Sequence, residues 1–397
     1  MYSSWVEIDA DALRSNLRAV RAALPRATAL MFVVKANAYG HDSRLVARTA
    51  AREGIDWFTV AHTREALTIR NDAGSARILV LGAPFAEEVP ALLDHNVLSA
   101  VVSLDHARAL AAKALRRKKR LPVHLKIDTG MGRMGLLWPS ALAEASEILR
   151  LEGLDVQGIC THFARVEPGE DDPARIQMAR FAEVADAVDR AAGRRLFRHV
   201  SNSRAILCRP EWDCDGVRPG ILLYGYGASS ETGRLRTHPV LHWKSRVVQA
   251  RHVPADFPVG YYGTYRTPAS TNLAVVGLGY ADGYLRSLSN RSHVLIRGRR
   301  CRVVGRVSMN WIIVDTGPYG EVADGDEVVL IGRQGNQEIW ADELAILCRT
   351  IPYEILTCIQ GAIPRTLLGR GSPFSEEEFP SPARPRKKTG KRTKRKG

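Results

Sequence analysis

Short runs of apolar residues alternate with stretches of helical spacing through the first half of the chain. One such stretch runs from Leu13 to Leu24 with apolar residues on one helical face. Asp9 or Asp11 can cap its start, and Pro25 stops it. The apolar runs predict strands at 31–34, 57–60, 78–82, 97–102, 123–127, 156–160, 199–201 and 220–224. Repeated strand–helix units predict a parallel sheet, and about eight of them fit a (β/α)8 barrel better than an open, doubly wound sheet.

The pattern changes at about residue 238, where short apolar runs follow one another without long helical stretches. They predict strands at 240–248, 274–280, 292–296, 301–307, 311–314 and 327–331, followed by one helix at 341–347. Closely spaced short strands are typical of a mostly antiparallel β domain. The sequence therefore predicts an α/β protein with a barrel domain at 9–235 and a C-terminal β domain at 236–370. Residues 1–8 could attach to the β domain.

Length and composition agree with two domains. The chain has 397 residues, of which 45% are hydrophobic, and this exceeds one ordinary domain. No apolar run approaches the ~20 residues of a membrane span. The N-terminus lacks a basic-then-apolar signal region, so we expect a cytoplasmic protein. The six cysteines contain no C-x-x-C pair, which argues against a metal site or a disulfide framework. Cys208 and Cys214 could pair or bind metal, but free thiols agree better with a reducing cytosol.

The formal net charge of +15 arises largely at the C-terminus. From Arg384 onward there are nine Lys or Arg and no acid, so subtracting nine from fifteen leaves +6 for residues 1–383. We expect 371–397 to be a disordered basic tail. It could bind nucleic acid or another polyanion, or it could be a solvated tail that aids solubility. No aromatic or glycine pattern interleaves with its charges, which favours solubility and leaves nucleic acid as a partner only through this tail.

A lysine ends the first expected barrel strand. Burying an ammonium is costly, so Lys35 either extends outward to solvent or is held as a neutral amine for chemistry. In barrels the catalytic groups gather at the carboxyl ends of the strands. Further polar residues follow the other expected strands, namely Arg133, His162, Ser203 and Arg218. Taken singly, each has an ordinary explanation, such as a hydrogen-bonded core histidine for His162. No G-x-G-x-x-G follows any of these strands, so a dinucleotide site has no support.

Several segments carry a joint signal that no single residue provides. In the first half they are 33–41, 126–135, 161–164, 201–203 and 217–225, and in the second half 259–265, 279–286, 305–310 and 352–355. Together and in this order they resemble the alanine racemase family, two-domain enzymes that carry pyridoxal phosphate on a lysine. The resemblance covers roughly residues 3 to 368. It implies an alanine racemase that supplies D-alanine for peptidoglycan, and a head-to-tail homodimer with composite active sites.

The resemblance also implies roles for individual residues. Lys35 would form a Schiff base with the cofactor and act as one base, and Tyr261 of the second subunit would act as the other. The cofactor contacts implied are Lys35, Tyr39, His162, Ser203, Arg218, Gly220, Ile221 and Tyr353. The substrate carboxylate would meet Arg133 and the backbone N–H of Met309. Lys126, which matches a lysine carbamylated in some members, would support the site together with Tyr280 and Asn310.

Charge explains two of these roles. A tyrosine phenol ionises near pH ~10 in water, so a tyrosine base needs nearby positive charge, for which His162 and Arg218 are the candidates. In the family this arginine meets the cofactor ring nitrogen. Because arginine cannot accept a proton at neutral pH, the nitrogen would stay unprotonated and a long-lived quinonoid would be disfavoured.

The chain departs from the family pattern at four positions, Asp42, Glu167, Tyr262 and Asn310. Tyr262 and Asn310 lie closest to the substrate end, so they leave the substrate open more than the reaction. Three hypotheses stand: an alanine racemase, a racemase for serine, lysine, arginine or a broader range, and a pyridoxal-phosphate-binding carrier or decarboxylase of related barrel fold. The β domain argues against a carrier, and the motif at Tyr261 argues against a decarboxylase.

Overall fold

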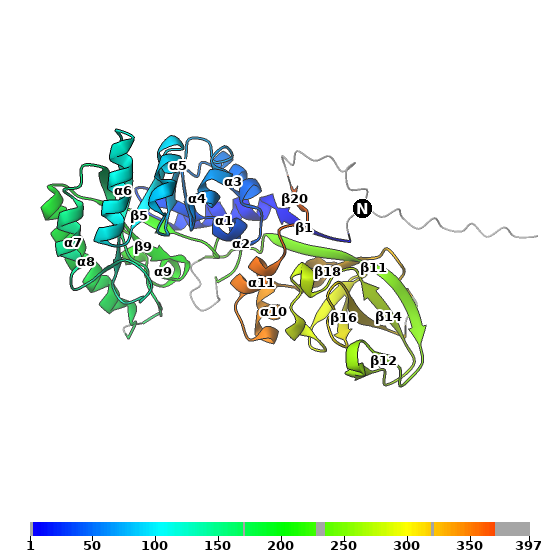
Figure 1. Ribbon diagram of the computed structural model, residues 1–397. Helices are drawn as coiled ribbons and strands as arrows, with labels where there is room; N and C mark the ends of the chain where they lie inside the picture. The colour runs from blue at the N-terminus through cyan, green and yellow to red at the C-terminus, as the bar shows by residue number, and fades with distance from the viewer. Residues whose placement is uncertain (1–2, 170, 228–234, 319–320, 370–397) are drawn as a thin grey trace, which may run out of the picture.

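The computed structural model describes residues 3–169, 171–227, 235–318 and 321–369, which form two lobes joined side by side (Figure 1). The basic tail expected at 371–397 lies outside these residues. Every helix in the described part of the chain is too short or too polar to cross a membrane.

The first lobe is a closed parallel barrel of eight strands. The strands are β2 (Ala29–Val33), β3 (Trp57–Val60), β4 (Arg77–Val80), β5 (Val97–Val101), β6 (Leu121–Asp128), β8 (Leu154–Cys160), β9 (Phe197–Asn202) and β10 (Gly216–Arg218). Each pairs in parallel with its neighbours, and the β5–β6 and β10–β2 pairings close the ring. The expected (β/α)8 barrel is therefore confirmed. The short β7 (Leu136–Leu137) extends the sheet beside β6.

Helices surround this barrel (Figure 1). They are α1 (Ala10–Ala23), α3 (Ser43–Arg52), α4 (Thr63–Ile69), α5 (Val89–Asp94), α6 (Leu104–Arg116), α7 (Ala141–Ile148), α8 (Ala174–Ala192) and α9 (Ser203–Cys208). Of the two candidate caps for α1, Asp9 is the one used, because its carboxylate accepts from the backbone N–H groups of Asp11 and Ala12. The short 3-10 helices η1 (Ala86–Glu88) and η2 (Pro210–Trp212) lie between longer elements.

The prediction of a strand at 220–224 is wrong. The last barrel strand is β10, and the residues after Pro219 form consecutive turns, in which the N–H of Leu223 donates to the carbonyl of Gly220 at 2.9 Å. The apolar run is buried because the turn packs into the core, where Tyr224 is fully covered. A short apolar run does not by itself distinguish a strand from a buried turn.

The second lobe is a mostly antiparallel β domain, as expected. Its longer strands are β11 (Leu241–Val253), β14 (Thr271–Val276), β15 (His293–Ile296), β16 (Arg299–Val304), β17 (Ile312–Gly317) and β18 (Glu327–Gln334). Pairing of β18 with β11 closes these six strands into a ring. The shorter elements are β12 (Pro258–Val259), η3 (Tyr261–Gly263), β13 (Tyr265–Arg266), η4 (Tyr280–Asp282), η5 (Arg286–Leu288) and β19 (Gln337–Ile339).

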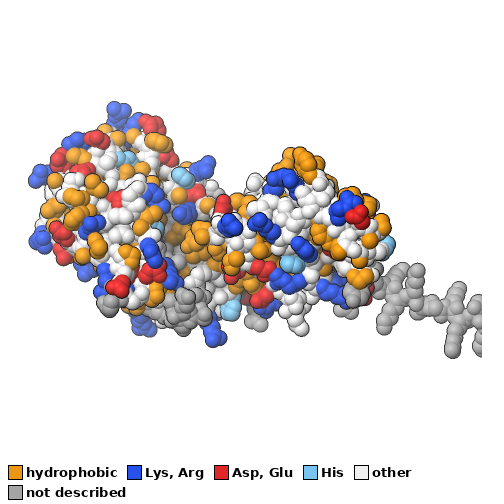
Figure 2. Space-filling view, turned by 90° about the horizontal axis from the view of Figure 1, so that it is seen from below, with side chains coloured by type: hydrophobic (Ala, Val, Ile, Leu, Met, Phe, Trp, Pro, Cys, Tyr) orange, Lys and Arg blue, Asp and Glu red, His pale blue; other side chains and the backbone are white. Residues whose placement is uncertain are grey.

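The lobes are joined by elements from both ends of the chain. The first strand, β1 (Ser4–Asp9), pairs antiparallel with β11 and parallel with β20 (Arg365–Leu368). After the expected helix α10 (Ala341–Cys348) comes α11 (Pro352–Cys358), which the hydrophobic pattern did not predict. Figure 1 shows α11 at the junction of the two lobes, and this helix carries Tyr353 toward the barrel. The space-filling view shows a narrower waist between the lobes (Figure 2).

Candidate active site

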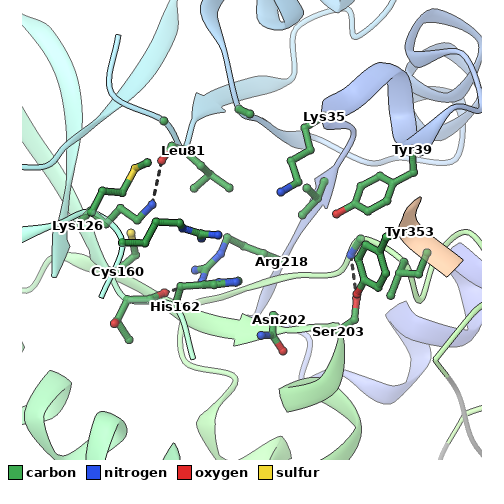
Figure 3. A pocket seen from close by; sticks show the side chains of 18 of the residues that line it. Lys35, Tyr39, Leu81, Lys126, Cys160, His162, Asn202, Ser203, Arg218 and Tyr353 are labelled. Atoms are coloured by element: carbon green, nitrogen blue, oxygen red, sulfur yellow. Dashed lines mark hydrogen bonds between the residues drawn. The ribbon is translucent and has the colours of Figure 1, made fainter. Parts of the chain in front are cut away.

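A cavity of about 430 Å³ lies at the carboxyl ends of the barrel strands (Figure 3). It gathers most of the candidate residues. Those that line it are Lys35, Tyr39, Lys126, Arg133, His162, Ser203, Arg218, Gly220, Ile221 and Tyr353. They come from five different barrel strands or the segments that directly follow them and, for Tyr353, from α11 of the second half. The barrel therefore brings together side chains that are far apart in the sequence.

Lys35 is presented by an uncommon backbone turn. The segment α2 (Lys35–Tyr39) contains four residues, Ala36 to Tyr39, with φ between 52° and 55°, which is left-handed. This conformation is strained for residues other than glycine and persists only where its surroundings hold it. Figure 3 shows the Lys35 amine and the Tyr39 hydroxyl both directed into the cavity. Burial, and then the charge of Arg133, lower the pKa of Lys35, which favours the neutral, nucleophilic amine.

Hydroxyl groups gather at one end of the cavity. Tyr39, Ser203 and Tyr353 lie on the same side in Figure 3, and the rings of Tyr39 and Tyr353 are 5.6 Å apart. Burial raises the pKa of both phenols, so they remain protonated hydrogen-bond donors. A Cβ at Gly220 would lie 2.4 Å from the Tyr39 oxygen, so a larger residue there would displace that hydroxyl. Converging hydroxyl and backbone N–H donors suit an anion such as phosphate.

The Ser203 hydroxyl is oriented by the backbone beside it. Its oxygen accepts from the N–H of Gly220 at 3.0 Å and from the N–H of Leu222 at 3.4 Å. The hydroxyl hydrogen is therefore available to donate into the cavity.

The opposite side of the cavity is cationic. Arg218 is buried and donates to the backbone carbonyls of Thr161 (2.6 Å), His199 (2.5 Å) and Val200 (3.0 Å). Among the described residues it has no carboxylate partner. Burial, and then the charges of Arg218 and Arg133, lower the pKa of His162 to about 3. Of the two residues expected to supply positive charge, only Arg218 is therefore charged near neutral pH.

Two buried histidines behind Arg218 were not predicted as site residues. Arg218 Nη1 donates to His199 Nδ1 at 2.5 Å, and His199 Nε2 lies 2.8 Å from His124 Nδ1. Burial, and then the charge of Arg218, lower the pKa of both imidazoles, so both are neutral near pH 7. A Cβ at position 158 would lie 2.6 Å from the His124 ring, so Gly158 makes room for this pair. A polar residue at an inward position of an expected barrel strand was the available sequence signal.

Lys126 and the loop that carries Arg133 lie beside the cationic end. Lys126 Nζ donates to the Leu81 carbonyl at 3.2 Å, and burial lowers its pKa. The Asp128 carboxylate accepts four backbone N–H bonds, from Gly130 through Arg133. Burial alone would raise the pKa of Asp128, but these hydrogen bonds lower it. Asp128 thus shapes the loop that places Arg133, and sequence reasoning missed it.

The other candidates from the second half do not reach the cavity of their own chain. Tyr261, Tyr280, Met309 and Asn310 are exposed on the β domain. Their loops pack together, because Tyr280 N donates to Ser308 O at 3.0 Å and a Cβ at Gly260 would lie 3.3 Å from Arg306 N. We call this surface, formed by 260–262, 279–281 and 306–311, the β-domain rim.

Two departures from the family pattern occupy backbone positions that favour glycine. Asp42 has φ 71° and Tyr262 has φ 63°. Asp42 is accommodated because its carboxylate caps α3, accepting from the N–H groups of Arg44 and Leu45. The Tyr262 ring is exposed, and the Arg306 guanidinium lies 4.7 Å from its centroid. Glu167 pairs with Arg165 at 2.8 Å, and nothing in the structure explains Asn310.

Comparison with known proteins matches both lobes to domains of the same family. The N-terminal domain of alanine racemase matches residues 8–228, and its C-terminal domain matches residues 240–367. The barrel has a cavity lined by Lys35 at the carboxyl ends of its strands and is followed by such a β domain. Together with the two domain matches, this defines a two-domain amino-acid racemase.

Individual relatives support the same family. The alanine racemase of Desulfosudis oleivorans is 41% identical over 376 residues, covering 92% of this chain and 96% of that protein. The structure of alanine racemase from a D-cycloserine-producing Streptomyces lavendulae has a TM-score of 0.87 at 34% identity, covering 96% and 99% of the two chains. That from Bartonella henselae, solved with covalently bound pyridoxal phosphate, has a TM-score of 0.82 at 27% identity, covering 93% and 100%. The chain belongs to the alanine racemase family.

Proposed function

We propose that this protein is an alanine racemase that interconverts L-alanine and D-alanine with pyridoxal phosphate. The observation that supports this best is the cavity lysine. Lys35, whose pKa is lowered by burial, lies between a hydroxyl cluster and the buried guanidinium of Arg218. An amine that loses its proton easily can bond to the carbonyl of such a cofactor. The product D-alanine would serve peptidoglycan synthesis in the cytoplasm.

The hydroxyl end of the cavity fits the cofactor phosphate. Tyr39, Ser203 and Tyr353 would donate their hydroxyl hydrogens to it, with the backbone N–H of Ile221 beside them, while the N–H of Gly220 holds the Ser203 oxygen. The small Gly220 leaves the space that a Cβ would fill.

The cationic side fits the rest of the group. Pyridoxal phosphate supplies an electron sink for charge that develops at the substrate Cα. Arg218 would donate to the ring nitrogen, and a guanidinium cannot protonate that nitrogen near neutral pH. The neutral His162 lines the same cavity, where its ring could meet an incoming base.

Racemisation requires bases on both faces of the substrate Cα. Lys35 serves one face. The cavity phenols of Tyr39 and Tyr353 cannot take up a proton near neutral pH, because burial raises their pKa and keeps them protonated. The family resemblance implies Tyr261 as the base for the second face, and this residue lies exposed on the β-domain rim. We therefore propose a head-to-tail homodimer in which the partner subunit's Tyr261 completes each cavity.

The same arrangement would hold the substrate carboxylate. Arg133 would bind it from the barrel, and the backbone N–H of Met309 would bind it from the rim of the second subunit, supported by Tyr280 and Asn310. Lys126 would add CO2 to its neutral amine and release a proton, which gives a carbamate. That anion would orient Arg133, and the burial that lowers the pKa of Lys126 favours the neutral amine that this step needs.

A broader amino-acid racemase is the second candidate. It is favoured by Tyr262, whose ring and the Arg306 guanidinium stand beside Tyr261 on the rim. Racemisation rates of the purified protein with pyridoxal phosphate on L-alanine, L-serine, L-lysine and L-arginine separate the two. Alanine as the fastest substrate supports the first candidate, and a larger amino acid as the fastest supports the second. Bound cofactor without turnover of any of them would contradict both.

A further inference from the structure

The left-handed turn that carries Lys35 and Tyr39 is held from both ends. Four successive residues other than glycine adopt positive φ, which costs free energy at each of them. Backbone hydrogen bonds at its ends run from Ala38 N to Val34 O, from Gly40 N to Ala36 O and from His41 N to Ala38 O. Contacts from outside the turn must therefore stabilise it.

The first end is held within the barrel by Glu65 on α4. One carboxylate oxygen accepts from the N–H of Ala36 at 2.7 Å. The other accepts from the N–H groups of Ala61 at 2.8 Å and His62 at 3.1 Å. Glu65 therefore ties the turn to the loop after β3.

The second end is held by a side chain that comes 325 positions later in the sequence. Arg365, on β20, donates from Nε to the Gly40 carbonyl at 3.1 Å. Its remaining nitrogens donate to the carbonyls of Ile359 (3.0 Å), Gln360 (2.6 Å) and Ile363 (2.5 Å). These carbonyls directly follow α11. One half-buried guanidinium thus joins the lysine turn to the chain after the helix that carries Tyr353.

The backbones of the lysine turn and of α11 also pack closely, and we call this contact between 36–40 and α11 the joint. A Cβ at Gly40 would lie 2.2 Å from the Leu356 carbonyl oxygen of α11, and Gly40 has φ 83°. The turn and the helix therefore have little freedom to shift past each other while Arg365 holds them. Tyr39 on one side of this joint and Tyr353 on the other both supply hydroxyls to the cavity.

We infer that Arg365 is a positioning residue for the cofactor cavity, which fixes the lysine turn against α11 and so sets how Tyr39 and Tyr353 converge on one anion. Arg365 does not line the cavity itself. The inference rests on the proposed function in that the anion is the phosphate of pyridoxal phosphate. The geometry of the joint itself does not depend on that function.

The test uses the full-length protein with Arg365→Met and Arg365→Lys. The matched control is Arg333→Met, because Arg333 lies in the same lobe and makes an exposed ion pair with Glu338. After removal of the cofactor, the dissociation constant of pyridoxal phosphate is measured by titration of its absorbance. We expect it to rise about tenfold in Arg365→Met, less in Arg365→Lys, which keeps a cation with fewer donors, and not at all in the control.

Hydrogen exchange of the cofactor-free proteins gives an independent readout. We expect faster exchange in Arg365→Met at residues 36–40 and 352–358, with the barrel strands unchanged. Gly40→Ala, which forces the same joint apart from the turn side and keeps the Arg365 side chain, should produce the same pattern. If Arg365→Met folds poorly, the lysine variant carries both measurements.

Unchanged cofactor affinity in Arg365→Met would overturn the inference, whether or not the variant is less stable to urea. Unchanged exchange at residues 36–40 would overturn it as well. A wild-type protein that does not bind pyridoxal phosphate would instead contradict the proposed function, while the exchange result would still decide whether Arg365 holds the turn.

Discussion

The barrel cavity and the β-domain rim are built in opposite ways. In the cavity, Arg218 is 4% exposed and Lys126 is 7% exposed, and hydrogen bonds to backbone carbonyls fix both. On the rim, Tyr261 is 65% exposed and Met309 is 55% exposed. Burial shifts the pKa of the cavity groups. The cavity offers buried cationic groups, and the rim offers an exposed phenol and a backbone N–H. We expect such a division where a second copy of the chain completes the site.

The largest effect is expected at Lys35, the group through which the cavity would hold its cofactor. Lys35→Ala should lower racemisation of alanine by more than about 10³-fold, because it removes both the covalent anchor and one base. The absorbance of the lysine-bound cofactor should disappear as well. Lys113→Ala, on the outer helix α6, is the control and should change neither. Full activity of Lys35→Ala without added amine would contradict the assignment.

The second-largest effect is expected at Tyr261, and it distinguishes the rim from the cavity directly. Tyr261→Ala should lower activity by about 10²- to 10⁴-fold while the cofactor still binds, because the cavity would stay intact and one face would lose its base. Isotope washout at Cα should be lost mainly for one enantiomer. Equal loss for both enantiomers would count against two bases.

Mixing the two inactive proteins tests whether each site is composite. A hybrid dimer of Lys35→Ala and Tyr261→Ala chains contains one doubly altered site and one unaltered site if the rim completes the cavity of its partner. Unfolding and refolding the mixture should then restore activity to about a quarter of the wild-type value, since about half of the dimers are hybrids. No recovery, with hybrid dimers shown by mass spectrometry, would place Tyr261 in the cavity of its own chain or outside the site.

A smaller effect should appear in the dependence of stability on pH. Burial, as the largest cause, lowers the pKa of His124 and of His162 to about 3. The unfolded chain, with histidine pKa values near ~6.5, therefore binds more protons than the folded one between these values. The free energy of unfolding should fall as the pH is lowered through this window, by up to ~1.4 kcal/mol per pH unit for each such histidine.

Removal of one buried histidine should reduce that slope. Urea unfolding of the cofactor-free protein between pH 7 and pH 5 should show a shallower decline for His124→Gln than for the wild type. His252→Gln, at an exposed histidine of the β domain, should leave the slope unchanged. An equal decline in all three proteins would mean that His124 does not contribute to the acid sensitivity.

The smallest effect is expected on the rim. Tyr262→Gly relieves a left-handed residue and removes the ring beneath Arg306, two changes of about 1 kcal/mol that act in opposite directions. Stability should change by less than about 1 kcal/mol. If Tyr262 and Arg306 favour larger substrates, the rate on lysine relative to alanine should fall by about tenfold in Tyr262→Gly. An unchanged ratio would remove Tyr262 as a specificity residue.

The local pattern of apolar and polar residues was sufficient to predict most of the fold and many of the candidate site residues. The barrel strands were located to within a few residues, because buried parallel strands are short apolar runs bounded by helical stretches. The run at 220–224 was misassigned, because the same composition can cover a core as a turn. Helix α11 was missed because it has only seven residues and begins at Pro352.

The supporting groups of the site were harder to predict than its lining. Glu65, Asp128 and His199 act on residues of the cavity through hydrogen bonds, and His124 acts through His199. For the two histidines the only local signal was a polar residue at an inward strand position. The left-handed turn after Lys35 also lacks a sequence signal, because alanine, asparagine and tyrosine all adopt right-handed or extended backbone more readily.

Spacing along the chain was enough to predict the order of the two domains, the family and the set of residues that could carry the chemistry. Which of these residues meet depends on the folded arrangement. Lys35, Arg218 and Tyr353 converge on one cavity, whereas Tyr261 remains on a separate surface. The reason is physical: burial, charge neighbours and contacts such as that of Arg365 with Gly40 arise between residues hundreds of positions apart. They therefore exist only once the chain has folded.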